Sequence, residues 1–373
     1  MTVVVRTSTD RCPGVLAVHQ AADGGLARIR VPGGLLSVTQ LDVLRSASLD
    51  LGDGRLELTS RGNLQIRALR PDGPRELSDR LYRAGLLPSL THERVRNILV
   101  SPLSGLDGRY DVLPLAAALD RALCAHPGLA ELPGRFLFAL DDGRGDLVAS
   151  GADVLVQAVD AREALLTLGA RGVRVGWGEV VEVMLAAAAT FLEVRDAAEW
   201  RIAEVEDGES RILERLGLQA TDELPAAGAP VEAGEHGAAL VATVPLGSLT
   251  QEQAVLLTEV ADWVRVTPWR SIVLPAMAGE PLQAVGLITT PDSIWNGVTA
   301  CAGRPGCAKA LADVRGDAQR IVPQLVRDGR RVHWSGCERR CGKPAGGFVD
   351  ILAVGNGYQV DGAVVDFPAR ETW

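Results

Sequence analysis

The chain has 373 residues, more than one hydrophobic core usually organises, so two or three domains are expected. Hydrophobic residues make up 47% and charged residues 23% of the sequence, which is typical of a folded globular protein and excludes disorder over most of the length. The formal net charge of -9 excludes a general electrostatic attraction to nucleic acid or anionic lipid.

No stretch reaches the roughly 18 uninterrupted apolar residues of a membrane span, and the start of the chain lacks the apolar core of a signal peptide. We therefore expect a cytoplasmic protein that has neither a membrane nor a nucleic acid as its partner. The most apolar run, Val180–Val194, is rich in alanine and contains two glutamates, so it predicts a buried helix.

The first predicted elements belong to an internal repeat. Residues 26–69 and 239–277 each give the pattern of a strand, a helix and two further strands. Val31 aligns with Val244 and Thr59 with Thr267, so the offset between the copies drifts only from 213 to 208. In the second copy, Thr250 and Gln253 have the spacing of a capping box, which predicts a helix start there.

The chain is expected to divide into five segments. The repeats lie in 12–90 and 238–290, and between them 91–205 has strand-like sequences such as FLFAL and VLVQAV that predict an α/β lobe. Residues 206–237 are acidic and rich in Ala, Gly and Pro, which is typical of a linker. A last lobe, 291–373, contains four of the six cysteines.

Cysteines in the last lobe carry the strongest chemical signal. Cys301 and Cys307 form C-x5-C, and Cys337 and Cys341 form C-x3-C, with several glycines beside them. Because the cytoplasm keeps thiols reduced, metal or redox chemistry explains these residues better than disulfides. Four thiolates on two glycine-rich loops favour a [4Fe-4S] cluster, while zinc, which usually shows tighter spacings, and unrelated thiols remain alternatives.

The two cysteine pairs together with the duplication resemble the sulfite and nitrite reductase superfamily, in which a [4Fe-4S] cluster abuts a sirohaem. The resemblance covers nearly the whole chain. It implies an α+β fold of duplicated ferredoxin-like half-domains plus two α/β lobes, related by a pseudo-two-fold axis. It also implies that Cys341 lies between the cluster and a tetrapyrrole.

Basic residues of the first half form the other wall of the pocket in that superfamily. The segment LTSRGNLQ looks like its first arginine motif and implies a tetrapyrrole-binding role for Arg61. VRNILVSP looks like the second motif and implies the same for Arg96. LPGRFLF matches the third motif at Arg135, but Leu137 stands where the superfamily has a lysine, which weakens the cationic patch that an oxyanion needs.

Within the superfamily, the segments RCPG, ELTSRGNLQ and TPWRSIVLP look most like the precorrin-3B synthases of aerobic cobalamin biosynthesis. That resemblance implies a mono-oxygenase that hydroxylates precorrin-3A with O2 and external reducing equivalents and closes a lactone. The precorrin would occupy the place of sirohaem. Guanidinium groups suit its carboxylate arms because they bind two oxygens at once.

The resemblance also introduces a non-haem iron for oxygen activation, which would need histidine and carboxylate ligands. The five histidines are scattered and have no metal-binding spacing, although His333, four residues before Cys337, fits either a supporting role or packing. No nucleotide-binding glycine motif lies between a strand and a helix. Electrons are therefore expected from a ferredoxin or a separate reductase.

Two alternatives stay open at this stage. The chain could be a sirohaem-dependent sulfite or nitrite reductase, which the cysteine pattern favours and Leu137 disfavours. It could instead be a four-cysteine zinc or redox-sensing module that catalyses no reaction, although the arginine motifs argue against that class.

Overall fold

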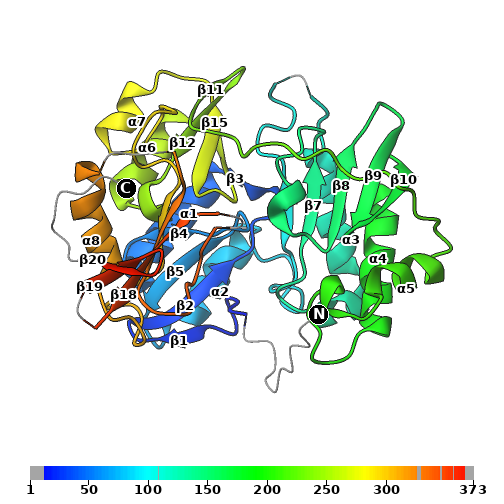
Figure 1. Cartoon of the computed structure of the whole chain (residues 1–373), viewed down its shortest axis with the longest axis horizontal. Coiled ribbons are helices and arrows are strands. Elements are labelled where there is room, and N and C mark those ends of the chain that lie inside the picture. The colour runs from blue at the N-terminus through cyan, green and yellow to red at the C-terminus, as the bar shows by residue number, and fades with distance from the viewer. Residues whose placement is uncertain (1–11, 108, 326–328, 345–346, 356, 366–373) are drawn as a thin grey trace. The chain divides into compact units, whose positions relative to one another are not determined.

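The computed structural model describes residues 12–107, 109–325, 329–344, 347–355 and 357–365 (Figure 1). The chain forms two compact units. Unit 1 takes its described residues from Met1–Gly14, Ile29–Leu35 and Gly85–Val231, and unit 2 from Val15–Arg28, Leu36–Ala84 and Glu232–Trp373. Arg11 of the RCPG motif and residues 366–373 of the last predicted segment lie outside the described residues.

Both predicted repeats contain the strand, helix, strand and strand of the pattern, with two further short strands before the helix and a second helix at the end. The elements of the first repeat are β1 (His19–Ala21), β2 (Gly24–Ile29), β3 (Leu35–Ser37), α1 (Val38–Leu51), β4 (Leu56–Leu58), β5 (Leu64–Leu69) and α2 (Gly73–Arg83). Those of the second are β11 (Gly234–His236), β12 (Ala239–Thr243), β13 (Ser248–Leu249), α6 (Gln251–Val260), β14 (Trp263–Val266), β15 (Ser271–Pro275) and α7 (Glu280–Ala284).

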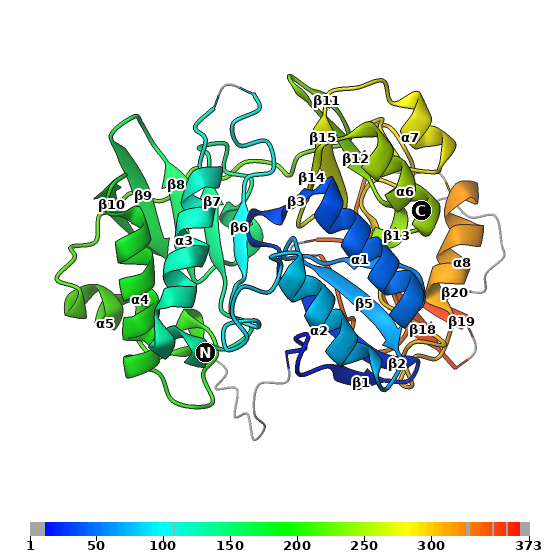
Figure 2. The same ribbon diagram turned by 180° about the vertical axis from the view of Figure 1, so that it is seen from behind.

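Each repeat gives one strand to the sheet of the other. The sheet orders are β1-β2-β5-β4-β13 and β11-β12-β15-β14-β3, so β13 pairs with β4 in one sheet and β3 joins β14 in the other. Helices α1 and α6 pack side by side, and Gln251 donates to the carbonyls of Arg45 and Gly54 (Figure 2). This reciprocal exchange relates the half-domains by a pseudo-two-fold axis, as the sequence predicted.

Both long repeat helices begin with a capping box. Ser37 and Gln40 satisfy one another's backbone donors at the start of α1, and Thr250 and Gln253 do so at the start of α6. The first copy's capping box was not singled out in the sequence, although its residues occupy the same place in the repeat. The predicted box in the second copy is confirmed.

The two α/β lobes also share one topology, which the sequence did not reveal. The lobe of unit 1 contains β6 (Ile98–Val100), α3 (Leu113–Ala125), β7 (Phe138–Asp141), β8 (Val154–Ala158), β9 (Glu163–Leu168), β10 (Arg171–Gly176), α4 (Val180–Val194) and α5 (Gly208–Arg215). The lobe of unit 2 contains β16 (Val298–Ala300), α8 (Val314–Ile321), β17 (Val332–Ser335), β18 (Val349–Val354), β19 (Gly357–Val360) and β20 (Ala363–Val365). In each lobe three parallel strands precede two antiparallel ones, with a helix between the first and second strand. The duplication therefore includes the lobes as well as the half-domains.

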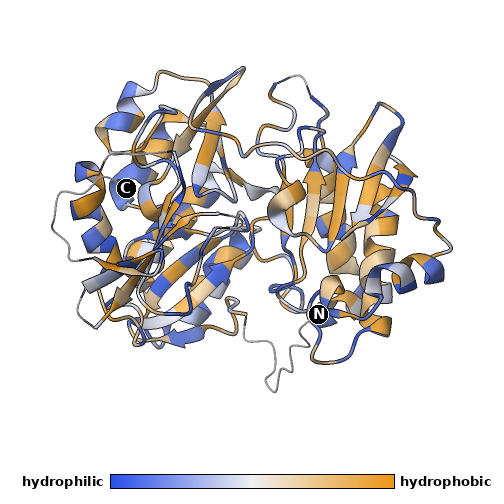
Figure 3. Ribbon diagram, viewed as in Figure 1, coloured by the Kyte–Doolittle hydropathy of each residue, from blue (hydrophilic) through white to orange (hydrophobic). Residues whose placement is uncertain are grey.

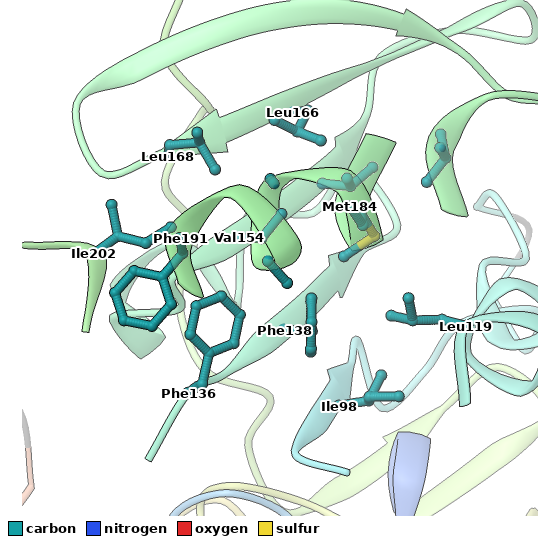
Figure 4. Close-up of a cluster of buried hydrophobic side chains, with 14 of the residues drawn as sticks. Ile98, Leu119, Phe136, Phe138, Val154, Leu166, Leu168, Met184, Phe191 and Ile202 are labelled. Atoms are coloured by element: carbon teal, nitrogen blue, oxygen red, sulfur yellow. The ribbon is translucent and has the colours of Figure 1, made fainter. Parts of the chain in front are cut away.

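The strands and helices of the unit 1 lobe are largely hydrophobic (Figure 3), and buried residues of α3, α4 and α5 belong to its core. At the centre of this core the rings of Phe136 and Phe138 lie 5.1 Å apart, and Phe136 contacts Phe191 of α4 (Figure 4). Helix α4 has the bounds that its apolar run predicted. Its two glutamates stay outside the fully buried set, so the apolar residues between them fill the core.

The segment predicted as a linker, 206–237, is partly ordered into secondary structure. Helix α5 lies within it, and Ile212 and Leu213 of that helix are buried in the unit 1 core. Charged residues dominate α5, so its narrow apolar stripe was missed among the acidic residues of the segment. The five-segment division as a whole stays a prediction.

Short 3-10 helices complete the fold. They are η1 (Pro32–Gly34), η2 (Pro127–Glu131), η3 (Val148–Ser150), η4 (Ile202–Glu204), η5 (Pro245–Gly247) and η6 (Val322–Gln324). No helix within the described ranges is long and apolar enough to cross a membrane.

Candidate functional site

The two cysteine pairs lie in loops that follow neighbouring parallel strands of unit 2. Cys301 comes directly after β16, and Cys337 comes two residues after β17. The carboxyl ends of parallel strands meet at one sheet edge, so the two loops start side by side. The N–H of Cys301 donates to the carbonyl of Trp334 at 2.9 Å, which extends the ladder into the first loop.

Backbone groups of these loops already contact sulfur. The N–H of Gly336 lies 3.1 Å from Sγ of Cys301, and the N–H of Leu311 donates to the carbonyl of Gly336 at 2.8 Å. A Cβ atom on Gly336 would lie 2.7 Å from the Cβ of Ala310, so a larger residue would push the loops apart. Such N–H groups directed at thiolate sulfur are the hydrogen bonds that tune iron–sulfur clusters.

The other three thiols lie close enough to Cys341 to affect its ionisation. Burial raises the pKa of the Cys341 thiol, and the charges of Cys301, Cys337 and Cys307 raise it further. In the ranges that the structure describes, no three His, Cys, Asp or Glu side chains are placed to hold a single metal ion. The donor set, four soft ligands from two glycine-containing loops, fits an iron–sulfur cluster, in which each thiolate binds a different iron.

A serine stands at the equivalent place in the unit 1 lobe. Ser101 follows β6 as Cys301 follows β16, and its N–H donates to Leu140 at 3.0 Å. The N–H of Asp142 donates to Oγ of Ser101 at 3.2 Å, which repeats the contact from Gly336 to Cys301. The backbone frame of the cysteine loops therefore forms with an oxygen in place of sulfur.

Two arginines attach the first cysteine loop to the first half-domain. Arg67 of β5 pairs with Asp23 through two hydrogen bonds and donates to the carbonyl of Gly306 at 2.7 Å. Arg315 of α8 donates to the carbonyl of Cys301 at 3.2 Å and pairs with Glu57 through both terminal nitrogens. Each guanidinium thus joins a carboxylate of the half-domain to the loop.

His333 is buried beside the second cysteine loop. One ring nitrogen, Nδ1, lies 2.8 Å from Oγ1 of Thr299, and the ring packs edge-on against Phe348. Burial, reinforced by the charge of Arg270, lowers the pKa of His333 to about 3, so the ring is neutral. His333 also hydrogen-bonds the backbone of Cys341, so its contacts fit both of its predicted roles, packing and support of the cysteine loop.

Arg61 lies in the turn between β4 and β5, in the same unit as the cysteines. The turn is closed by a hydrogen bond of 2.9 Å from the N–H of Thr59 to the carbonyl of Asn63, and Oγ1 of Thr59 accepts from the N–H of Arg61. Arg61 is partly buried. Its backbone is thus fixed by a hydrogen-bonded turn on the half-domain that also contacts the first cysteine loop.

The predicted ligand residue Arg96 is engaged within unit 1. Two of its nitrogens donate to the two carboxylate oxygens of Asp120, each at 2.7 Å, and a third donates to the carbonyl of Leu86 at 3.0 Å. The Arg96 side chain is 5% exposed. The fork therefore contacts a carboxylate of α3 and a backbone carbonyl, and a role for Arg96 in tetrapyrrole binding stays a prediction.

Replacing Arg96 by alanine is expected to lower the free energy of unfolding by about 3 kcal/mol, because Asp120 would lose its partner in a mostly buried position. Urea unfolding of the variant measures this loss. The exposed pair of Arg215 and Glu193 is the control, and its removal should change stability by less than about 0.5 kcal/mol. An unchanged midpoint for Arg96→Ala would contradict the structural role.

Arg135 is partly buried at the start of the segment that leads into β7. The neighbouring Leu137 is 2% exposed, and its N–H donates to Asp153 at 2.9 Å. The side chain of a lysine at position 137 would start from this buried position, where burying an ammonium group costs free energy unless the group is paired. The unit 1 packing therefore accommodates the leucine that departs from the superfamily motif.

Comparisons with known proteins show what this chain is similar to. Residues 19–84 match the family described as the nitrite/sulfite reductase ferredoxin-like half domain. A precorrin-3B synthase of a Sinorhizobium species is 27% identical over 97% of this chain and 84% of its own length. The chain is a relative of the nitrite and sulfite reductases. The resemblance predicted from the cysteine and arginine motifs is thereby confirmed.

Further relatives of the superfamily extend the likeness. A ferredoxin–nitrite reductase of Synechococcus elongatus is 27% identical over 91% of this chain and 78% of its own length. The solved structure of the Mycobacterium tuberculosis NirA protein matches 90% of this chain and 74% of that chain with a TM-score of 0.72 at 21% identity, which confirms the fold class. The relatives named here are oxidoreductases, so this chain is related to redox enzymes over most of its length.

The superfamily motifs did not identify every polar residue around the cysteine loops. Arg67, Arg315 and Glu57 lie in strands or helices, and no spacing in the sequence marks them. Arg270 is a different case, since it directly follows Trp269, the repeat counterpart of Arg61. Comparing the two turns residue by residue would have pointed to it.

A cavity of about 460 Å³ in unit 2 borders the first cysteine loop through Arg315. Its wall also includes Arg55, Leu246, Trp295 and Gln319. This volume lies in the range of small-molecule sites. The guanidinium of Arg315 already binds the carboxylate of Glu57 and the carbonyl of Cys301. Arg55 is the other arginine that lines the cavity.

Proposed function

We propose that this chain is a mono-oxygenase that converts precorrin-3A to the hydroxylated lactone precorrin-3B, using O2 and reducing equivalents from a ferredoxin or a separate reductase. The observation that carries the proposal is the gathering of four cysteines at one sheet edge in a chain similar to a precorrin-3B synthase over 97% of its length.

In this proposal Cys301, Cys307, Cys337 and Cys341 hold a [4Fe-4S] cluster that passes electrons to the substrate site. The loop N–H of Gly336 supports the sulfur of Cys301, and Arg67 and Arg315 fix the loop that carries the first pair. The ligands of a non-haem iron and the group that assists lactone closure are not assigned. The cytoplasmic location stays a prediction.

Among the three predicted arginines, Arg61 is the one we propose for a carboxylate arm of the precorrin. It shares unit 2 with the cysteine loops, and its backbone is fixed by the turn after β4. Arg96 could bind such an arm only if its pair with Asp120 opened. A substrate-binding role for Arg135 is proposed from its sequence motif alone.

Replacing Arg61 by alanine is expected to weaken precorrin binding by roughly ten- to a hundredfold, because a charge-assisted contact is worth about 1.5 to 3 kcal/mol. Fluorescence or absorbance titration with the tetrapyrrole measures this. Arg75→Ala, which removes an exposed arginine of α2, should leave binding unchanged. Equal affinities of Arg61→Ala and the parent protein would exclude this role.

A sirohaem-dependent nitrite or sulfite reductase is the second candidate, favoured by the ferredoxin–nitrite reductase relative. The deciding experiment gives anaerobically prepared protein a reductant and compares precorrin-3A plus O2 with nitrite and sulfite. Formation of the hydroxylated lactone supports the proposal. Six-electron reduction of sulfite or nitrite by sirohaem-containing protein would support the second candidate, and stoichiometric zinc without sulfide would exclude both.

A further inference from the structure

The turns that precede β5 and β15 are copies of one another. In the first, the N–H of Thr59 donates to Asn63 at 2.9 Å, and in the second, the N–H of Thr267 donates to Ser271 at 3.0 Å. The third residue after each threonine has a positive φ, 61° in both cases. That residue is Gly62 in the first turn and Arg270 in the second.

Arg270 occupies a backbone conformation that glycine adopts without strain. Left-handed backbone is costly for a residue with a Cβ atom, and Gly62 shows that the turn forms with glycine. An arginine in this position therefore gives the turn no stability of its own. A strained residue that persists in a fold points to a function for its side chain.

The side chain of Arg270 follows a path between two glycines to the second cysteine loop. A Cβ on Gly247 would lie 2.4 Å from Cδ of Arg270, and a Cβ on Gly342 would lie 2.9 Å from its Nη2. At the end of this path Nη2 donates to the carbonyl of Gly342 at 2.9 Å. Gly342 directly follows Cys341.

Three guanidinium groups from outside the cysteine loops thus bind carbonyls of these loops, and they differ in how far a carboxylate compensates their charge. Arg67 is neutralised by Asp23, and Arg315 is neutralised by Glu57. For Arg270, no carboxylate lies within ion-pair distance among the residues that the structure describes, although Glu57 attracts it from farther away. Burial and the charge of Arg315 lower the pKa of Arg270 to about 10, which keeps it protonated at neutral pH.

We propose that Arg270 is a positioning residue that holds the Cys341 loop by its carbonyl and places an uncompensated positive charge beside the iron–sulfur cluster, which raises the reduction potential of the cluster. This inference rests on the proposed cluster. Reduction adds one negative charge to the cluster, and a partly buried cation nearby stabilises the reduced form more than the oxidised one. The uncompensated arginine therefore makes the cluster easier to reduce by an external donor.

The test uses full-length protein prepared anaerobically, with the potential followed by visible absorbance during a redox titration. Arg270→Gln removes the charge, and Arg270→Gly also restores the residue that the first repeat has in this turn. We expect both variants to keep one cluster per chain. Half-reduction of the cluster should need about a tenfold higher ratio of reduced to oxidised mediator, which is a fall in reduction potential of about 59 mV. Arg270→Lys, which keeps the charge, should stay near the potential of the parent.

Arg75→Gln is the control, because Arg75 is an exposed arginine of α2 and solvent screens its charge. Its potential should fall by less than that of Arg270→Gln. Parent-like potentials in both Arg270→Gln and Arg270→Gly would overturn the inference and leave the proposed function intact. A parent protein without iron and sulfide would overturn the proposed function, and this inference with it.

Discussion

Replacing Cys301 by serine is expected to abolish the iron–sulfur absorbance while leaving the fold of the lobe intact. Serine is a poor cluster ligand compared with thiolate, so the cluster should lose one of its four anchors. The fold should survive because Ser101 occupies the equivalent position after β6. Ser101 accepts a hydrogen bond from the N–H of Asp142, as Cys301 accepts one from the N–H of Gly336. The chain thus contains its own precedent for this substitution.

Iron and acid-labile sulfide, measured on anaerobically purified protein, report the loss, and circular dichroism reports the retained fold. Cys301→Ala is the second variant, because it leaves no side-chain oxygen to bind iron. Cys124→Ser, in α3 of unit 1, is the control and should keep a full cluster. Full iron and sulfide in both Cys301 variants would exclude Cys301 as a ligand.

Local sequence signals predicted the repeats well. The capping box at Thr250 and the apolar run of α4 each depend on neighbours in the chain, and each is found where it was expected. The cysteine pairs also lie in loops, as expected from the glycines beside them, whereas their role as ligands of one cluster stays a prediction. These features need no knowledge of the tertiary fold.

Tertiary contacts were not predictable in the same way. The lobes share strand order and direction, but the repeat that could be read from the sequence covers only the half-domains. Arg96 matched a family motif, yet its role depends on Asp120, 24 residues later in another element. Motifs identify residue types at positions, whereas the partner that saturates a side chain is set by packing.

Replacing Glu57 by alanine should lower the free energy of unfolding by about 4 kcal/mol, a larger loss than that expected for Arg96→Ala. The Glu57 side chain is 6% exposed and accepts hydrogen bonds from Arg315 and from Ser248 of the other repeat. Without this carboxylate, Arg315 becomes an unpaired, largely buried cation. The positive charges of Arg315 and Arg270 repel one another, and the negative charge of Glu57 offsets that repulsion.

The double variant Glu57→Gln with Arg315→Met separates the ion pair from the rest of the network. It leaves neither member of this pair as an unpaired buried charge, so it should recover most of the stability that Glu57→Ala loses, as replacement of buried pairs by neutral residues often does. Arg315 also donates to the carbonyl of Cys301, and Glu57 fixes the position of Arg315. Both variants should therefore lose the cluster to a chelator faster than the parent protein does. Chemical unfolding and the rate of iron release measure the two effects separately. A Glu57→Ala protein as stable as the parent would show that the cysteine lobe does not depend on this pair.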